Sequence, residues 1–462
     1  MKQTRSPVIA LIPNDTVGEQ MAGPGIRYWE FARVLGERFQ VKLIVPPFVQ
    51  MDSIPDTGSL PASLHVCVHA RDLRALVETS DVIITRGVVL TAYPFLTKLG
   101  KPLVLDMYNP FLLEGLQREA EADLLKKLTT HENDLQALRL QLRAGDFFLC
   151  ADERQRDYWL GMLSAMGRVN PYNHQRDPTL RHLIDLAPFG MPEKPPQHIH
   201  PVLKGVYKTI AADDKVILWG GGIWNWLDAP TLIQAMSLIL RQRGKVKLFF
   251  MGIKRPNLGM AQMKAVDRAI ALSKELGLYQ GAVLFHDWVP YEERQNYLLE
   301  ADVGVNLHLD HIETRFAFRT RLLDYVWAGL PILSTGGDVL SEALAAQNLA
   351  YLVEPGDVDG VAQAILSLLA NPTLRAECAP RFREVAAQYH WKVCARSLIK
   401  FCAAPHFAPD KAYRYQGFLS APTGEQNPWR RLLGKAWRAL RIGGVSGLVQ
   451  QCREYLRWQR SK

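Results

Sequence analysis

Two glycine-rich stretches of the chain have the residue types that can bind an anionic group. Gly23 and Gly25 lie shortly after the first apolar run, and Arg27 follows them where a helix is expected to begin. Glycines let the backbone approach a ligand closely, and a helix N-terminus or a guanidinium attracts phosphate. A later apolar run is followed by three consecutive glycines that can form a phosphate nest: Gly220, Gly221 and Gly222. Neither stretch has the spacing of a nicotinamide, flavin or P-loop site, and each is also compatible with an ordinary turn.

A third stretch combines carboxylates with arginines before a helix that should end at Gly329. Its guanidinium groups are candidates for contacts with phosphate or sugar: Arg315, Arg319 and Arg321. Glu313 precedes them, and Asp324 on the helix is a candidate for binding ribose hydroxyls. In the plainer alternative, Arg321 and Asp324 only pair with each other, because they are three residues apart on one helix face.

Alternating short apolar runs and amphipathic segments should position these residues. The predicted strands are Val8–Pro13, Val41–Pro46, Val82–Thr85, Leu103–Asp106, Phe147–Cys150, Lys215–Trp219, Val246–Met251, Val283–Phe285, Val303–Leu307 and Ile332–Ser334. Such alternation indicates parallel sheets built from βαβ units. A proline-rich segment, Pro188–Pro201, divides the strands into two sets. We therefore expect an α/β protein with two tandem Rossmann-like, doubly wound domains, at residues 1–190 and 191–403, and a linker and tail at 404–462.

The helical segments are expected at Gly25–Gly36, at Glu114–Arg143 as one long charged helix, and at Arg381–Phe401. In open parallel sheets a ligand binds beyond the carboxyl ends of the strands. Two such sheets in tandem should therefore enclose the site in a cleft between them. Asp106 ends one of the first-domain strands, where it either faces this cleft or forms a turn.

The net charge of +9 is concentrated in residues 427–462, which hold nine basic residues and one acidic residue. Because residues 1–426 are nearly neutral, a nucleic-acid groove across the fold is not expected. The basic tail is expected to have a binding partner of its own. Trp429, Leu432, Leu433, Trp437 and Leu440 recur at helical spacing among arginines, as in an interfacial helix on anionic lipid. The apolar stripe could instead pack on the protein body.

The six cysteines lack the spacing of a metal site or of a disulfide framework, which is typical of a cytoplasmic protein. No apolar segment is long enough to span a bilayer, so we expect at most peripheral binding to the inner face of the cell membrane.

Four motifs in one order carry a resemblance to a known family: GPGIRYWE, HDWVPYEER, ADVGVNL and DYVWAGLPI. Over Pro7–Phe401 the chain resembles the retaining GT-B glycosyltransferases of family 4. The resemblance implies that the second domain holds a nucleotide sugar and that the first faces the acceptor. It also implies that no metal bound by a DxD motif and no other cofactor is needed.

Carried over by position, the resemblance places Asp324 at the second glutamate of the EX7E motif, which binds ribose. Phe316 stands at the first glutamate, and Glu313, three residues away, is its candidate substitute. No basic residue follows the glycines of the second domain before Asp228, so Arg319, Arg321, Lys254 or Arg27 should neutralise the diphosphate. The predicted catalytic residues are Glu313, Arg319 and Asp106. The predicted donor-binding residues are Gly220, Gly221, Gly222, Lys254, Arg321, Asp324 and Asp287. The phosphate and acceptor side is predicted to comprise Gly23, Gly25 and Arg27.

These expectations define a hexosyltransferase-type enzyme that moves a sugar from a nucleotide-sugar donor to a glycan or glycolipid acceptor. A bacterial role in cell-surface polysaccharide synthesis would fit a basic tail that binds anionic membrane. Two alternatives remain open: a catalytically inactive scaffold or binding protein of the same fold, and a nucleotide-sugar epimerase. Nucleotide binding would separate the scaffold from the enzymes, and a product formed without acceptor would identify the epimerase.

Overall fold

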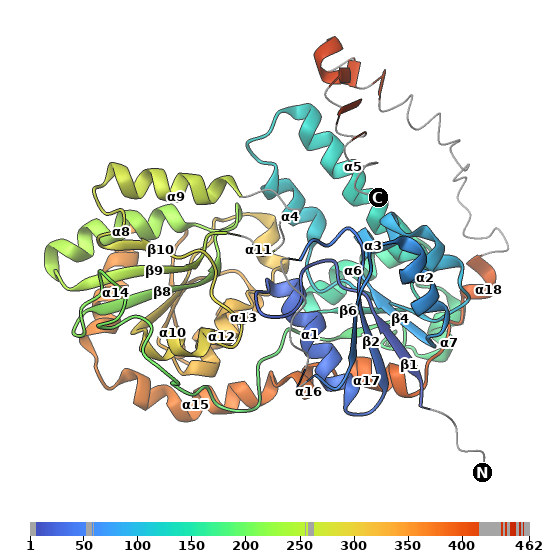
Figure 1. Cartoon of the computed structure of the whole chain (residues 1–462), viewed down its shortest axis with the longest axis horizontal. Coiled ribbons are helices and arrows are strands. Elements are labelled where there is room, and N and C mark those ends of the chain that lie inside the picture. The colour runs from blue at the N-terminus through green and yellow to red at the C-terminus, as the bar shows by residue number, and fades with distance from the viewer. Residues whose placement is uncertain are drawn as a thin grey trace.

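The structure is a computed structural model with two α/β domains side by side (Figure 1). It describes residues 6–51, 58, 60–254, 256 and 263–414, and in the tail residues 436–437, 439–440, 444–449, 452–453 and 456. The first sheet has seven parallel strands in the order β3-β2-β1-β4-β5-β6-β7. The second has six in the order β10-β9-β8-β11-β12-β13. Both orders reverse direction beside their first strand, which is the doubly wound arrangement that the strand pattern predicted.

The first domain is built from strands β1 Val8–Leu11, β2 Gln40–Val45, β3 Ser63–Val66, β4 Val82–Thr85, β5 Leu103–Asp106, β6 Phe147–Cys150 and β7 Ile184–Leu186. Its helices are α1 Gly23–Gly36, α2 Ala70–Glu78, α3 Gly87–Ala92, η1 Pro94–Lys98, α4 Phe111–Arg118, α5 Leu124–Ala144, α6 Glu153–Ala165 and α7 Pro171–Arg176. Every residue of β1, β4, β5 and β6 is buried. Continuous apolar runs form these strands because helices cover both faces of the sheet (Figure 1).

The second domain contains strands β8 Lys215–Gly222, β9 Val246–Gly252, β10 Val283–Phe285, β11 Val303–Asn306, β12 Ile332–Thr335 and β13 Ala350–Val353. Its helices are α8 Ala229–Gln242, α9 Lys264–Glu275, α10 Arg294–Glu300, α11 Ile312–Phe316, α12 Arg321–Ala328, α13 Val339–Ala346, α14 Val358–Ala370 and α15 Leu374–Gln388. Gly329 ends α12 with a φ of 61°, a left-handed conformation that glycine adopts without strain. This ending matches the one expected from the sequence.

Beyond α15 the chain crosses back to the first domain along the lower edge of the molecule (Figure 1). Helices α16 Trp391–Cys394, α17 Arg396–Ala403 and α18 Lys411–Arg414 complete this return. Phe401 stacks on Phe147 with ring centroids 4.9 Å apart. The buried Arg168 guanidinium binds the Asp410 carboxylate at 2.6 Å. The end of residues 191–403, which the sequence assigned to the second domain, therefore packs on the first domain. The first residues of the predicted linker, including Asp410, pack there too.

Two predicted helices differ from the structure. The segment Glu114–Arg143 is not one helix, because α4 ends at Arg118 and α5 begins at Leu124 after Asp123, whose carboxylate accepts a hydrogen bond from the Lys126 amide at 2.8 Å. The segment Arg381–Phe401 is also wrong as a single helix. It is divided among α15, α16 and α17.

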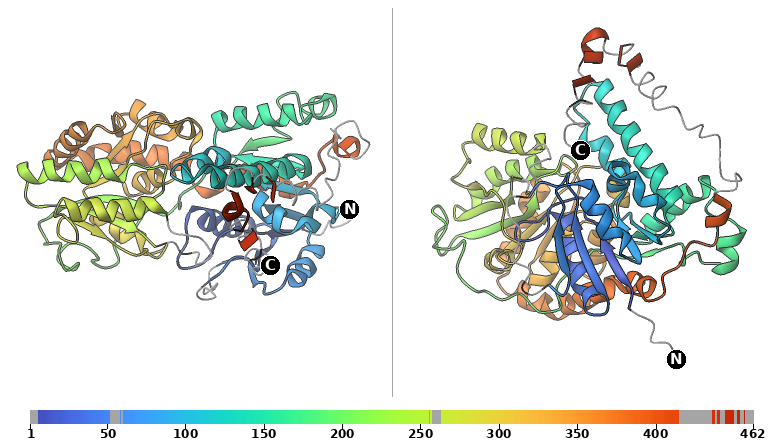
Figure 2. Two further views of the ribbon diagram at one scale, coloured as in Figure 1. Left: turned by 90° about the horizontal axis from the view of Figure 1, so that it is seen from above. Right: turned by 45° about the vertical axis from the view of Figure 1, so that its right-hand side comes forward.

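Direct hydrogen bonds join the two domains around a shared cleft. The Tyr291 hydroxyl donates to Glu30 at 3.0 Å, and the Gln155 amide donates to the Phe316 carbonyl at 2.8 Å. On the α5 side, the Asn225 amide donates to the Arg118 carbonyl at 2.8 Å. Residues that follow strands of both sheets therefore line one cleft, and Figure 2 shows the two domains from two further directions.

Candidate active site

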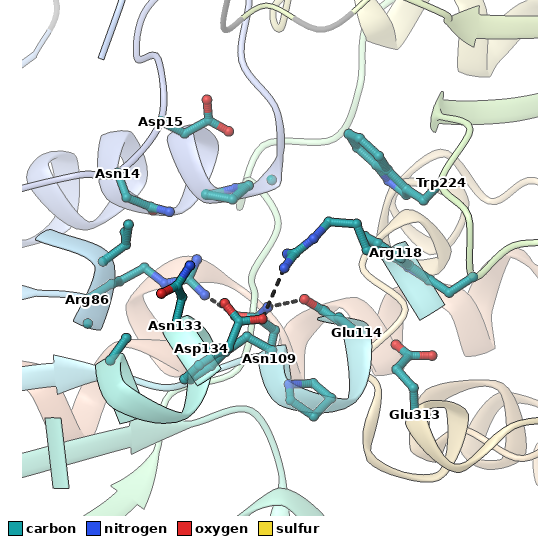
Figure 3. Close-up of a pocket in the computed structure, with 18 of the residues that line it drawn as sticks. Asn14, Asp15, Arg86, Asn109, Glu114, Arg118, Asn133, Asp134, Trp224 and Glu313 are labelled. Carbon is teal, nitrogen blue, oxygen red and sulfur yellow. Dashed lines mark hydrogen bonds and ion pairs between the residues drawn. The ribbon is translucent and has the colours of Figure 1, made fainter. Parts of the chain in front are cut away.

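The cleft between the domains has a volume of about 1220 Å³. Both sheets contribute to it at the point where their strand order reverses, which is where open α/β sheets bind ligands. Its polar lining includes the residues labelled in Figure 3: Asn14, Asp15, Arg86, Asn109, Glu114, Arg118, Asn133, Asp134, Trp224 and Glu313. Asn306, Arg319 and Arg321 complete the second-domain side.

The turn between α11 and α12 holds a paired carboxylate and guanidinium in this cleft. Arg319 donates from its two terminal nitrogens to the two oxygens of Glu313, at 3.0 and 2.7 Å. Both residues are buried, and Thr314 accepts a third bond from Arg319 at 3.3 Å. The fork-to-fork geometry fixes the Arg319 guanidinium plane. Its Nε atom remains buried without a partner.

Arg321 has a different environment at the first residue of α12. One terminal nitrogen donates to the Gly222 carbonyl at 2.9 Å, and the guanidinium lies 4.5 Å from the Trp219 ring centroid. The other terminal nitrogen is buried without a hydrogen-bond partner. Burial lowers the pKa of Arg321 to about 10, so it is still a cation at neutral pH.

Buried donors without partners are rare, and they point to a ligand that is not present. Arg319 and Arg321 each offer such a donor in the same cleft. Asn306, at the end of β11, adds a buried side-chain oxygen without a partner. Two guanidinium groups with spare donors form a site suited to a diphosphate or another compact dianion.

The first-domain wall is a hydrogen-bonded chain of Arg86, Asn109 and Glu114. Arg86 donates to the Asn109 side-chain oxygen, and the Asn109 amide donates to Glu114 at 2.5 Å. Burial, followed by the nearby Glu313 carboxylate, raises the pKa of Glu114 to about 7. The Asn109 bond and the positive charges of Arg86 and Arg319 partly oppose this rise. The cleft therefore contains a carboxyl group that changes charge near neutral pH.

Arg27 uses its side-chain donors inside the first domain, and its predicted contact with phosphate stays a prediction. It binds both oxygens of Asp106, at 2.8 and 2.9 Å. It also donates to the carbonyls of Pro188 at 3.0 Å and Ala187 at 2.7 Å. Arg27 and Asp106 are buried, and the guanidinium lies between the rings of Phe31 and Tyr108. The pair therefore stabilises the first domain, and because Asp106 also lines the cleft, its predicted catalytic role stays a prediction.

The two predicted glycines of the first domain allow close packing at the start of α1. A Cβ atom on Gly25 would lie 1.9 Å from the Thr16 carbonyl oxygen, so only glycine fits. Gly23 lines the cleft, where the Tyr108 hydroxyl would be 3.5 Å from its Cβ. The free amides at the start of α1 therefore lie beside the cleft, as the sequence predicted, and their role in binding a ligand stays a prediction.

The remaining predicted donor residues lie around the cleft rather than in its lining. Gly220, Gly221 and Gly222 extend β8, and Gly221 adopts a φ of 77°. The Gly220 amide donates to the Tyr325 hydroxyl at 2.8 Å, so it is not free for a phosphate nest. Lys254 and Asp287 form an exposed ion pair at 2.6 Å. Asp324 accepts a bond from Arg294 at 3.2 Å rather than from Arg321, and its ribose role stays a prediction.

Sequence reasoning missed Glu114, Asn306 and Arg118 as cleft residues. Asn306 follows the rule for strand ends, so its position at the end of β11 could have identified it. Glu114 and Arg118 fell within the segment predicted as one long charged helix, and neither was singled out. The signal that separates α4 from that helix was the N-cap residue Asp123.

Within the described part of the chain, no group of acidic, histidine or cysteine side chains is arranged to hold a metal ion. No described helix is long and apolar enough to cross a membrane. The expectation that the activity needs no metal stays a prediction.

Comparisons with known proteins agree with this fold. Residues 214–371 match the family model described as "Glycosyl transferases group 1". No curated protein shows significant similarity to the chain in sequence. The second domain therefore carries a glycosyl transferase group 1 domain.

Solved structures extend the likeness over both domains. Sucrose-phosphate synthase from Thermosynechococcus elongatus superposes with a TM-score of 0.60 at 17% identity, over 86% of this chain and 98% of that one. WaaG, a glycosyltransferase involved in lipopolysaccharide biosynthesis, gives 0.58 at 14%, over 86% and 100%. HepE from Anabaena, solved with UDP and glucose, gives 0.57 at 12%, over 87% and 100%. At these identities the likeness establishes the two-domain GT-B fold.

Proposed function

We propose that this enzyme transfers a sugar from a nucleotide-sugar donor to a glycan or lipid-linked acceptor in the cleft between its domains. The observation that carries the proposal is the pair of spare donors on Arg319 and Arg321 at the switch point of the second sheet. Since HepE has been solved with UDP and with UDP-glucose, a uridine diphosphate sugar is the first donor to test.

In this proposal the two arginines stabilise the leaving diphosphate. Cleavage of the sugar–phosphate bond develops negative charge on the diphosphate oxygens, and fixed cations in a buried site lower the energy of that state. Glu313 holds Arg319 in place through two hydrogen bonds. We further propose retention, with the leaving phosphate accepting the acceptor proton on the same face of the sugar. The mechanism then requires no metal ion.

A donor screen tests the function. Thermal shift and calorimetry with UDP, GDP, ADP and dTDP sugars should detect one preferred base, and the preferred donor should be hydrolysed slowly without an acceptor. A new nucleotide sugar formed in that reaction would instead identify an epimerase. Failure of every nucleotide to bind would favour the inactive scaffold.

The Glu114 carboxyl predicts a pH dependence of donor binding. Because Glu114 and a diphosphate would be anions in one cleft, the protonated form of Glu114 favours binding, and that form is lost as the pH rises through about 7. We expect the Kd of UDP to rise about three- to tenfold between pH 6 and pH 8. Calorimetric titration at several pH values measures this change.

The matched control is Glu114→Gln, which keeps the size of the side chain and removes its charge. The titration of UDP itself is common to both proteins, so the difference between their pH profiles reports Glu114 alone. Parallel profiles would show that the Glu114 charge does not act on the bound nucleotide.

The basic tail is proposed to bind anionic membrane, where a lipid-linked acceptor of a cell-surface polysaccharide would be found. Among its described residues, Trp437 and Val445 are 63% and 71% exposed. Leu448 and Leu456 instead line the cleft, and a Cβ on Gly447 would lie 3.1 Å from Leu125 of α5. The predicted residues Trp429, Leu432 and Leu433 lie outside the described part of the chain.

Deleting residues 427–462 should abolish binding to anionic vesicles at low salt, because the tail carries most of the net positive charge. Sedimentation with phosphatidylglycerol vesicles measures this, and neutral phosphatidylcholine vesicles are the control. If the shortened protein still sedimented with anionic vesicles, the tail would not be the membrane contact.

A further inference from the structure

A second part of the cleft has its own set of side chains, beside the α4 and α5 helices. Trp224 lines it from the loop after β8, where the chain has no basic residue. Its ring is stacked on Trp226, with centroids 5.8 Å apart and planes at 13°. Figure 3 shows Trp224 close to Arg118, on the opposite side of the cleft from Asn14 and Asp15.

The Trp224 ring is held in place from behind. A Cβ on Gly222 would lie 2.8 Å from the ring, so the absence of a side chain there allows the close contact. Next to Trp224, Asn225 donates to the Arg118 carbonyl at 2.8 Å, which ties this loop to the end of α4. The indole is therefore a half-buried, oriented surface in the cleft.

A polar pair from the first domain lines the same cleft as the indole. Arg118 donates to the Asp134 carboxylate at 3.0 Å, and their side chains are 34% and 23% exposed. Gly115 makes room for this arrangement, because a Cβ there would lie 2.6 Å from the Asp134 oxygen. The pair thus presents planar donors and acceptors at one edge of the cleft, where a ligand can reach them.

An aromatic face next to a planar donor and acceptor pair matches the chemistry of a sugar ring. A pyranose has an apolar face of C–H groups and a rim of neighbouring hydroxyls. The apolar face can pack on an indole, and the hydroxyls can bond to a guanidinium and a carboxylate together. A bare phosphate would gain nothing from the indole and would be repelled by Asp134.

We propose that Trp224, Arg118 and Asp134 form a subsite for a saccharide ring, and that this ring belongs to the acceptor. The inference rests on the proposed function, since it names the chemical class of the second substrate. Two of the three residues come from the first domain, whereas the spare arginine donors are in the second. The acceptor would therefore present a sugar hydroxyl, not a protein or lipid hydroxyl, to the donor.

Saturation-transfer NMR with the full chain tests the subsite directly. The probes are methyl glycosides of glucose, galactose, mannose and N-acetylglucosamine, with linear sorbitol as a control for nonspecific contact. At least one glycoside should receive saturation at its ring protons. Trp224→Ala should weaken its Kd about tenfold, whereas Trp224→Phe should retain most of the affinity. Tyr351→Ala, on the exposed edge strand β13, is the control for loss of an aromatic side chain.

Arg118→Met removes the polar fork without touching Trp224 and gives a second test if Trp224→Ala does not fold. Equal glycoside affinity in the wild type and in either variant would overturn the proposal, as would no glycoside binding above sorbitol. Competition separates the two possible sources of the ring. If the subsite binds the acceptor, the glycoside stays bound when the preferred nucleotide sugar is added. If the nucleotide sugar displaces the glycoside but the nucleotide alone does not, the subsite binds the sugar ring of the donor.

The same samples are titrated with UDP, so that two failures can be told apart. UDP binding without glycoside binding would overturn the subsite alone. Glycoside binding without binding of any nucleotide would leave the subsite and overturn the proposed donor.

Discussion

Arg321→Gln is expected to lower kcat/KM by about 100-fold while leaving the fold as stable as the wild type. Arg321 is bound only to the Gly222 carbonyl and to the face of Trp219 in the described structure, and one of its buried nitrogens has no partner. Its charge is costly to bury, as the lowered pKa shows, so losing it should not destabilise the protein. Steady-state kinetics and thermal unfolding of the same sample measure both effects.

Arg319→Gln is the matched comparison and should behave differently. It also removes a spare donor, but it leaves the buried Glu313 carboxylate without its guanidinium partner. We expect a similar loss of activity together with a loss of stability of about 3 kcal/mol or more. If Arg321→Gln lost stability without losing activity, the two arginines would be structural and the diphosphate site would be elsewhere.

Arg27→Met should be among the most destabilising substitutions in the chain, by about 3–5 kcal/mol. It leaves the fully buried Asp106 carboxylate unpaired, and it also removes the donors that hold the Ala187 and Pro188 carbonyls. These carbonyls follow β7, so the variant would loosen the end of the first domain. Equilibrium unfolding in urea gives the change in free energy.

The double variant Arg27→Met, Asp106→Leu separates the charge from the packing. With no buried carboxylate left, it should recover a large part of the lost stability. A double variant as unstable as Arg27→Met would assign the stability to the two carbonyl contacts instead. Nearly unchanged stability with loss of activity in both variants would support the predicted catalytic role of Asp106.

The central strands could be predicted because their residues are buried on both faces. Runs such as Val82–Thr85 and Phe147–Cys150 are buried throughout and mostly apolar, and their predicted bounds agree with β4 and β6. The edge strands β3, β7 and β13 were missed, since each is partly exposed and none forms a continuous buried run. The break between α4 and α5 was missed because helix-forming residues continue across it, although Asp123 marked the second helix.

The site was predicted in part. Glu313, Arg319 and Arg321 were selected by residue type and by their place before a helix, and the structure gathers all three in the cleft. Arg27 was selected by the same reasoning and turned out to be buried. The sequence does not distinguish an arginine that binds phosphate from one that pairs with a carboxylate 79 residues away, as Arg27 does with Asp106. Only packing shows which donors remain free.

The sequence by itself was sufficient to establish two successive parallel, doubly wound sheets, the end of α12 at Gly329 and the concentrated charge of the tail. These features follow from hydrophobic periodicity and residue type over short stretches. Contacts between distant segments decided the rest. Three contacts join residues far apart in sequence: the stacking of Phe401 of α17 on Phe147, the pairing of Arg27 with Asp106, and the hydrogen bond from Asn225 to the Arg118 carbonyl. The tertiary packing of those segments decides how deeply each side chain is buried and which groups it bonds to. Burial and bonding partners in turn set the protonation state of a group and its accessibility to a ligand.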